Sequence, residues 1–202
     1  TASTTCAAIA NLVSLGVSLS VESCSEFLKV IERPAATDVC TATASALSTA
    51  LISQSFRVAD TAGGMFFLNL IIALGKRMKY GCEPETQKYL SASMLSIVKQ
   101  GTISKIEDHK MMHRIVSSIC KIPSFSKTCD WFALDCTVSS LWVLAQADAC
   151  CNIIAHSDLI VDMFKILREL DEKGSTEWSA AEITVRKRII GTLFLVSVTN
   201  RR

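Results

Sequence analysis

The stretch Ala44-Ser45-Ala46-Leu47-Ser48-Thr49-Ala50 decides how this chain folds. Its small residues surround one aliphatic side chain, Leu47, as in a helix that packs closely against its neighbours. Four more stretches of this kind occur, and their central aliphatic residues are Ile9, Leu95, Leu144 and Leu195. The intervals between successive centres are 38, 48, 49 and 51 residues. Recurrence at a nearly regular period of this length predicts stacked helical repeats.

The composition favours a single domain made of helices. Half of the 202 residues are hydrophobic and 20% are charged, which is enough apolar content for a substantial core and excludes a disordered chain. Only 8 Gly and 3 Pro occur, and no Asn-Gly or Asp-Gly pair is present to form the tight turns of a sheet protein. We therefore predict an all-α fold, without strands, in which residues 1–202 form one domain.

The predicted helices follow the apolar periodicity and group into units of a long, a short and a long helix. They are expected at residues 5–15, 21–31, 41–53, 56–61, 65–74, 89–99, 111–120, 134–146, 150–155, 159–170 and 180–198, with a short polar helix ending near His109. Polar loops are expected at 75–87, 122–132 and 170–179. The pair Gly63-Gly64 is expected to turn the chain sharply before the helix at 65–74, because glycine tolerates positive φ.

The charges are nearly balanced, which limits the partners that a bulk electrostatic field could attract. With 21 basic and 19 acidic residues the net charge is +2, so we expect no nucleic-acid partner. The longest apolar run, 65–74, is shorter than the about 20 residues that span a bilayer, so no membrane span is predicted. Three basic clusters are expected to be solvated helix ends and loops, with an anion-binding patch as the alternative. They are Lys76, Arg77 and Lys79; Arg186, Lys187 and Arg188; and Arg201 and Arg202.

The cysteines indicate a reducing compartment. The chain has nine of them, at positions 6, 24, 40, 82, 120, 129, 136, 150 and 151. No Cys-x-x-Cys pair occurs and no histidine lies at zinc-finger spacing, so no metal site is predicted. Most lie among apolar residues, where a free cysteine behaves as a small hydrophobe. We expect an intracellular protein, cytoplasmic or nuclear, and, since the chain has no initiator Met, a fragment of a longer one.

The block around Ser45 resembles an armadillo repeat. Ser45-Ala46-Leu47-Ser48-Thr49 is followed by Ala62-Gly63-Gly64-Met65 and an aliphatic run to Leu74, and residues 141–167 fit the same frame. The resemblance implies a right-handed α-solenoid of about four to five three-helix repeats. The repeats would cover roughly residues 1–34, 35–80, 81–125, 126–175 and 176–202. Most intervals exceed the usual repeat length of about 40–47 residues, which points to a divergent member with lengthened loops.

The resemblance also implies a concave binding groove. Nuclear-import adaptors of this family carry a Trp on each concave helix and an Asn four residues later, which together hold basic peptides. Here the Trp positions hold Ala7, Ser45, Ser93, Trp142 and Leu193, and the Asn positions hold Asn11, Thr49, Ile97, Gln146 and Ser197. This departure argues against binding of nuclear-localisation peptides. The residues expected to line the groove are Asn11, Ser45, Thr49, Ser93, Trp142 and Gln146.

Enzymatic motifs are missing from the sequence. His109 and His113 are four residues apart, as metal ligands on a helix would be, but no glutamate lies between them to act as a general base. No phosphate-binding glycine loop and no nucleophile elbow occurs. Cys151 precedes His156 by five residues, but it is expected on a buried helix. We predict a chain that is not an enzyme and that uses no cofactor and no metal.

The predicted function is that of a non-catalytic scaffold that binds a segment of another protein in its concave groove. Two alternatives are a homo-oligomerising structural domain and a docking module for anionic partners through the basic patches. Trp142 is expected to be a binding hot spot, or else a core residue between repeats. The aromatic residues Trp131, Phe132 and Trp178 are expected in loops, either tucked back onto the domain or in contact with a partner.

Overall fold

The computed structural model describes most of the chain. It covers residues 20–32, 37–53, 61–80, 83–101, 103–125, 127, 130–174 and 178–199, together with 4, 5, 8, 11 and 12. Most of the predicted helix at 5–15 and nearly all of that at 56–61 lie outside these residues.

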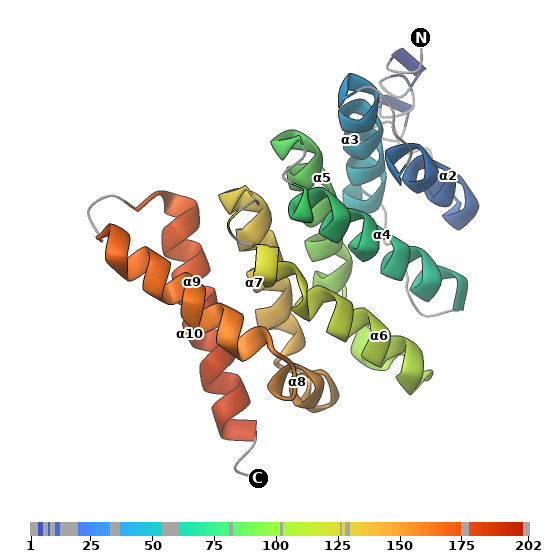
Figure 1. Cartoon of the computed structure of the whole chain (residues 1–202). Coiled ribbons are helices and arrows are strands. Elements are labelled where there is room, and N and C mark those ends of the chain that lie inside the picture. The colour runs from blue at the N-terminus through green and yellow to red at the C-terminus, as the bar shows by residue number, and fades with distance from the viewer. Residues whose placement is uncertain are drawn as a thin grey trace.

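The described chain is all-α, as predicted, and contains no strand within the described ranges. Its α-helices are α2 (Val21–Glu32), α3 (Thr37–Ser53), α4 (Thr61–Lys79), α5 (Pro84–Lys99), α6 (His109–Cys120), α7 (Trp131–Leu144), α8 (Asp148–Ala155), α9 (Leu159–Lys173) and α10 (Ala180–Thr199). Two 3-10 helices, Ile103–Lys105 and Ile122–Phe125, lie between them. Figure 1 shows these elements along the chain.

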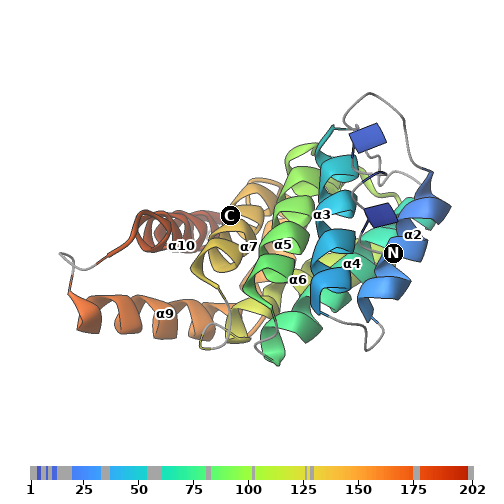
Figure 2. The same ribbon diagram turned by 90° about the horizontal axis from the view of Figure 1, so that it is seen from above.

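The long helices form two layers. In the first, α3 packs on α5, α5 on α7 and α7 on α10, so that helices far apart in the sequence lie side by side in order (Figures 1 and 2). In the second, α2 packs on α4 and α4 on α6, while α9 lies against α10. The short helix α8 contacts α6 and α10. In the first layer, each helix therefore packs on the next helix of that layer along the chain.

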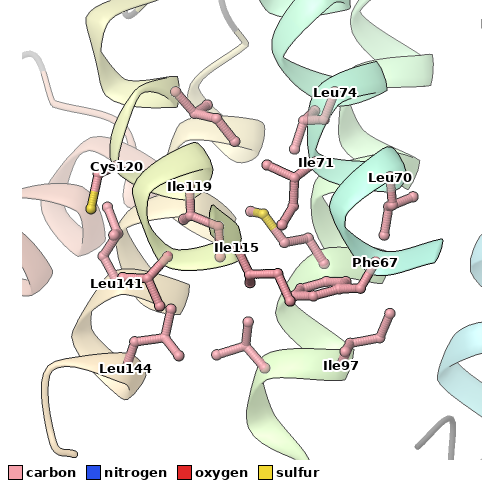
Figure 3. Close-up of a cluster of buried hydrophobic side chains, with 14 of the residues drawn as sticks. Phe67, Leu70, Ile71, Leu74, Ile97, Ile115, Ile119, Cys120, Leu141 and Leu144 are labelled. Carbon is pink, nitrogen blue, oxygen red and sulfur yellow. The ribbon is translucent and has the colours of Figure 1, made fainter. Parts of the chain in front are cut away.

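One hydrophobic core joins the two layers. Figure 3 shows its centre, where side chains from four helices meet. The labelled members are Phe67, Leu70, Ile71 and Leu74 of α4, Ile97 of α5, Ile115, Ile119 and Cys120 of α6, and Leu141 and Leu144 of α7. Every one of them is at most 4% exposed. Burial of a large aliphatic or aromatic side chain stabilises a fold by roughly 1.5–3 kcal/mol, so this cluster fixes how the layers sit on one another.

Aspartate caps begin two of the helices. Asp108 Oδ1 accepts hydrogen bonds from the backbone N–H groups of Lys110, at 2.9 Å, and Met111, at 3.2 Å. Asp130 Oδ1 accepts in the same way from Phe132 and Ala133. These bonds satisfy backbone donors that have no partner inside the helix. They explain why α6 and α7 begin two to three residues before the predicted starts.

Gly63 and Gly64 do not turn the chain, contrary to the prediction. Both lie in the first turns of α4, which continues to Lys79 and so also replaces part of the predicted loop at 75–87. A glycine inside a helix costs about 1 kcal/mol, less than the burial of the phenylalanines that follow in α4 contributes. Gly64 instead allows a close approach, since a Cβ there would lie 3.2 Å from Met111 Cγ of α6.

The aromatic residues expected in loops have different positions. Trp131 and Phe132 lie in the first turn of α7, with Trp131 packed against the core and Phe132 46% exposed. Trp178 does precede α10 in a connection, and its Nε1–H donates a hydrogen bond of 2.9 Å to the carbonyl oxygen of Leu170. Its ring also lies 5.2 Å below the guanidinium of Arg186. Trp178 is therefore tucked back onto α9 and α10.

The described cysteines are buried. They are Cys24, Cys40, Cys120, Cys136, Cys150 and Cys151. Burial raises the pKa of four of these thiols, those of Cys24, Cys120, Cys136 and Cys150, to about 11. They therefore remain protonated at neutral pH and act as small apolar side chains, as the sequence predicts.

Candidate functional site

An open pocket of about 620 Å³ lies between α3 and α5 and reaches the first turn of α7. It is lined by Ser45, Ser48, Thr49 and Ile52 of α3, by Glu85, Lys88, Tyr89 and Ala92 of α5, and by Phe132 of α7. On each of α3 and α5, the four lining residues stand at positions i, i+3, i+4 and i+7. One face of each helix therefore forms the pocket. The three helices are neighbours in the first layer (Figure 1).

The wall of the pocket is apolar and open to solvent. Ile52 and Phe132 expose 57% and 46% of their surface, and Tyr89 and Ala92 are half-buried beside them. A single exposed apolar side chain is ordinary on a protein surface. Several around one concavity are typical of a binding site.

The α3 side of the pocket is made of small hydroxyl residues. Thr49 Oγ1 donates a hydrogen bond of 3.0 Å to the carbonyl oxygen of Ser45, one turn earlier in the same helix. Ser48 is 3% exposed. Because these residues are short, they leave room between α3 and α5.

An ion pair closes one edge of the pocket. Lys88 Nζ lies 2.8 Å from Oε1 of Glu85, which is three residues earlier in α5. This hydrogen bond, with a smaller contribution from the charge of Asp130, raises the pKa of Lys88. The two charges on this rim largely compensate one another.

A second group of side chains surrounds Trp142 of α7, which is half-buried. The guanidinium carbon of Arg188, on α10, lies 4.2 Å from the centroid of the Trp142 ring, which is a cation–π contact. One turn further along α10, Gly191 faces the same ring. A Cβ at this position would lie 2.9 Å from Trp142 Nε1, so the contact between the helices requires glycine.

Charges from three helices interact at Asp135, two turns before Trp142 on α7. Burial raises the pKa of Asp135, on α7, while a hydrogen bond of 3.2 Å from Ser139 Oγ and the charges of Arg188 and Lys99 act in the opposite direction. Lys99 lies at the end of α5 and Arg188 in α10. Two cations and one half-buried carboxylate therefore share this part of the surface.

The pocket and the tryptophan lie on one face of α7. Phe132, Asp135, Ser139 and Trp142 follow one another at steps of three and four residues. Ten residues of helix separate Phe132 from Trp142, which corresponds to about 15 Å along the axis. We call the surface that runs from the pocket to Trp142 the groove face.

Two of the predicted groove residues, Ser45 and Thr49, line the pocket. The prediction that Ser93 lines the groove is wrong. Its side chain is fully buried, and its Oγ donates a hydrogen bond of 2.8 Å to the carbonyl oxygen of Tyr89. The residues of α5 that line the pocket are Tyr89 and Ala92. Consecutive residues of a helix point about 100° apart, so an error of one position moves a side chain from the surface into the core.

The other predicted residues lie away from the pocket. Trp142 is in contact with α10, at the far end of the groove face. Gln146 is exposed just after the end of α7, and Asn11 is exposed in the N-terminal described segment; neither lines the pocket.

The apolar residues of the pocket were missed by the sequence reading, although a signal for them exists. Ile52 follows Ser45 and Thr49 at helical spacing, and Ala92 follows Tyr89 by three residues. Extension of the predicted face of α3 by one turn leads to Ile52. The apolar periodicity does not point to Phe132, because its helix begins earlier than that periodicity indicates; the local signal for the earlier start is the N-cap Asp130.

A further cavity of about 720 Å³ lies between α6, α8 and α9. It is lined in part by His113, His156 and Cys120. The Nδ1 atom of His113 lies 3.3 Å from Ser117 Oγ, and that of His156 lies 2.8 Å from the carbonyl oxygen of Asn152. With a pKa of about 11, Cys120 is a protonated thiol rather than a nucleophile at neutral pH. Within the described ranges no group of three or more His, Cys, Asp or Glu side chains could hold a metal ion.

Comparison with known proteins places the chain in no family, because no family model, no curated protein and no solved structure matches it. Among the residues described, no helix has both the length and the apolar character needed to cross a bilayer. The function is therefore inferred from the groove face and its chemistry.

Proposed function

We propose that this chain is a non-catalytic interaction scaffold that holds a segment of a partner protein on its groove face. The observation that carries the proposal is the open pocket between α3 and α5, whose apolar wall includes Ile52 and Phe132 at 57% and 46% exposure. A volume of about 620 Å³ lies in the range of about 300–1,000 Å³ that is usual for binding pockets and accommodates one or two large side chains.

We infer a divergent armadillo-like architecture, a right-handed α-solenoid of about four to five repeats. The order in which α3, α5, α7 and α10 pack on one another supports this inference, because each repeat of a solenoid contacts its neighbours in the chain. The sequence α7, α8 and α9 also follows the long, short and long pattern, with 14, 8 and 15 residues. In such an architecture the first layer would form the concave side, on which the groove face lies.

The partner would dock as an extended or helical segment laid across the helices. One large apolar side chain would enter the pocket as the anchor, since buried anchors contribute most of the binding energy at interfaces. We place the protein inside the cell, in the cytoplasm or nucleus. This is supported by the six buried cysteines of the described residues, whose thiols a reducing compartment preserves.

Homo-oligomerisation is the second candidate function. It is favoured by α10, where four apolar side chains repeat along one exposed face. They are Ile183, Ile190, Phe194 and Val198, at 38%, 46%, 65% and 39% exposure. Light scattering at several concentrations distinguishes the two functions, because a monomer throughout would exclude self-association through this face.

Docking of anionic partners through Lys76, Arg77 and Arg186 of the basic patches has less support. Arg77 pairs with Glu83 at 2.8 Å, Lys76 with Glu32 at 3.4 Å and Arg186 with Asp171 at 3.5 Å. These cations are thus partly compensated within the chain.

The proposal is tested by selection of a displayed library of random peptides about 12 residues long, which span roughly 40 Å when extended. Selected peptides should bind the wild-type chain and lose at least about tenfold in affinity to Ile52→Gln, because that variant removes an apolar wall of the pocket. The matched control is Ile72→Gln in α4, since Ile72 is 39% exposed and does not line the pocket. Failure to select any peptide, or equal losses in both variants, would contradict the proposal.

A further inference from the structure

We propose that the partner segment is acidic: its apolar anchor fills the pocket, and an Asp or Glu side chain binds Arg188 over Trp142, about 15 Å from Phe132 along α7, with Lys99 of α5 as the second cation. This inference rests on the proposed function and specifies the chemistry of the partner. A basic segment is the alternative, because an accessible tryptophan on a binding face is the usual receptor for a cationic side chain.

The first argument is that the chain supplies its own cation to Trp142. Arg188 lies 4.2 Å from the ring centroid, within the range of about 6 Å in which a cation is attracted to an aromatic ring. A lysine or arginine of a partner would have to displace Arg188 or approach it against its positive charge. The tryptophan therefore does not favour a basic segment.

The second argument is that this contact is built into the packing of two helices. Arg188 and Gly191 are three residues apart on α10 and so face α7 together. Without the glycine, a Cβ would lie 2.9 Å from Trp142 Nε1, closer than a Cβ is found in folded proteins. The position of Arg188 over the ring thus depends on the close approach that Gly191 permits.

The third argument is that Arg188 and Lys99 can each still bind a carboxylate. Within the described part of the chain, neither Lys99 nor Arg188 forms an ion pair with a carboxylate closer than 4.0 Å. Asp135 interacts with both through its charge, but it is half-buried and bonded to Ser139. At the other end of the groove face, Lys88 is already paired with Glu85. Complementary negative charge is therefore needed at the Trp142 end and not at the pocket.

The geometry also sets the spacing in the partner. The separation of about 15 Å along α7 between Phe132, at the edge of the pocket, and Trp142 is spanned by four or five residues of an extended segment, at roughly 3.3 Å per residue. Because the pocket extends from Phe132 towards α3, the expected motif is one large apolar residue and an Asp or Glu at least four or five positions away. An arginine can bind a carboxylate through two parallel hydrogen bonds, which makes Arg188 the stronger of the two contacts.

The experiment selects random peptides of about 12 residues, a length of roughly 40 Å when extended, on the immobilised full chain and reads their composition. We expect enrichment of Asp and Glu at the stated distance from an apolar residue. A synthetic peptide of the enriched sequence should bind Arg188→Gln at least about tenfold more weakly, as expected for the loss of a charge-assisted contact. Lys187→Gln is the matched control, because it removes the same charge from the neighbouring, exposed position and should change the affinity less than about twofold.

A second variant keeps the test decisive if Arg188→Gln disturbs the fold. Lys99→Gln removes the other cation at an exposed position at the end of α5 and should weaken the same peptide by about threefold or more. Enrichment of basic peptides, or of apolar peptides that bind Arg188→Gln and Lys99→Gln as tightly as the wild type, would overturn this inference while the proposed function stands. If no peptide is selected, both fall.

Discussion

Arg188 lies 4.2 Å above the ring of Trp142, and this contact joins α10 to α7. A partly desolvated cation–π pair contributes about 0.5–2 kcal/mol, so the pair fastens the last helix of the first layer. The same pair decides which charge the groove face presents next to the tryptophan. In the proposed function, stability and recognition would therefore be linked at one position.

Gly191→Ala should destabilise the protein, although alanine is the better helix former. The added Cβ would lie 2.9 Å from Trp142 Nε1 and would push the ring away from Arg188. Overpacking of this kind costs about 1–3 kcal/mol, while the gain in helix propensity is roughly 0.5–1 kcal/mol, so we expect a net loss of up to about 2.5 kcal/mol. Urea unfolding followed by circular dichroism measures it.

Gly75→Ala is the control for this substitution. Gly75 is half-buried in α4, and a Cβ there would meet no atom within 4 Å. The substitution Gly75→Ala should raise the free energy of unfolding by roughly 0.5–1 kcal/mol. If Gly191→Ala and Gly75→Ala were stabilised by the same amount, the inferred close approach of Gly191 to Trp142 would be contradicted.

Asp135→Asn should stabilise the protein and tighten the binding of acidic peptides. Burial raises the pKa of Asp135 in the folded state, so its ionised form opposes folding, and stability is gained as the pH falls through that pKa. At neutral pH the neutral amide avoids this cost. A gain of up to about 1 kcal/mol would raise the thermal midpoint by about 2–4 °C.

Ser139→Ala provides the comparison for Asp135→Asn. Ser139 Oγ donates to Asp135 Oδ1 at 3.2 Å and stabilises its charged form, so its loss should lower the midpoint at neutral pH. Differential scanning calorimetry of both variants, with peptide titrations, checks the signs. A lower thermal midpoint in Asp135→Asn would contradict this prediction. It would show that the favourable contacts of the Asp135 carboxylate outweigh the cost of burying its charge.

Glu182→Gln should destabilise the protein at neutral pH and not in acid. Glu182 is 2% exposed; burial alone would raise its pKa, but hydrogen bonds from Lys173 Nζ and from the backbone N–H of Ser179, both 2.7 Å, hold the pKa below its ordinary value. Ser179 Oγ accepts in turn from the N–H of Glu182, which completes a capping box at the start of α10. Loss of the charged contacts should cost about 1.5–3 kcal/mol.

The pH dependence of this effect has a defined direction. Because the folded-state pKa is lowered, the stabilisation is complete above the ordinary value of 4.5 and is lost as the pH falls through the folded-state pKa. The stabilities of wild type and Glu182→Gln should therefore converge once the pH falls below the folded-state pKa of Glu182. Glu172→Gln, at an exposed position of α9, should leave the stability unchanged within about 0.5 kcal/mol. A difference that persisted in acid would exclude the charge as the cause.

The buried thiols should resist alkylation in the folded protein. With pKa values of about 11, Cys24, Cys120, Cys136 and Cys150 have little thiolate at pH 8. Iodoacetamide should modify them at least about a hundredfold more slowly than after unfolding in urea, because the thiolate is the nucleophile. Mass spectrometry of peptides from both states gives the rates. Rapid modification of any of these four would show that its helix opens.

Much of the secondary structure follows from local patterns. The positions of most helices could be predicted, because apolar side chains recur along them with the period of a helix. The caps at Asp108 and Asp130 are also local signals, and attention to them would have corrected the starts of α6 and α7. The error at Gly63-Gly64 arose because glycine permits a turn without requiring one, and the buried side chains of α4 favour helix.

The groove face could be predicted only in part. Ser45 and Thr49 line the pocket because α3 is the helix whose pattern is clearest. Ser93 was misplaced since the rotation of α5 depends on its packing between α3 and α7, and one residue of error corresponds to about 100°. The role of Trp142 depended on Arg188 and Gly191, which come more than 40 residues later in the chain.

The amino-acid sequence alone determined an all-α chain with buried cysteines, since both properties depend on composition and on local periodicity. It also indicated which helix would present small residues, at Ser45 and Thr49. The apolar pocket, the burial of Ser93 and the cation over Trp142 were decided by how α3, α5, α7 and α10 pack together. Those features arise from contacts between residues far apart in the chain, and the orientation of each helix is set by the neighbours on both of its sides.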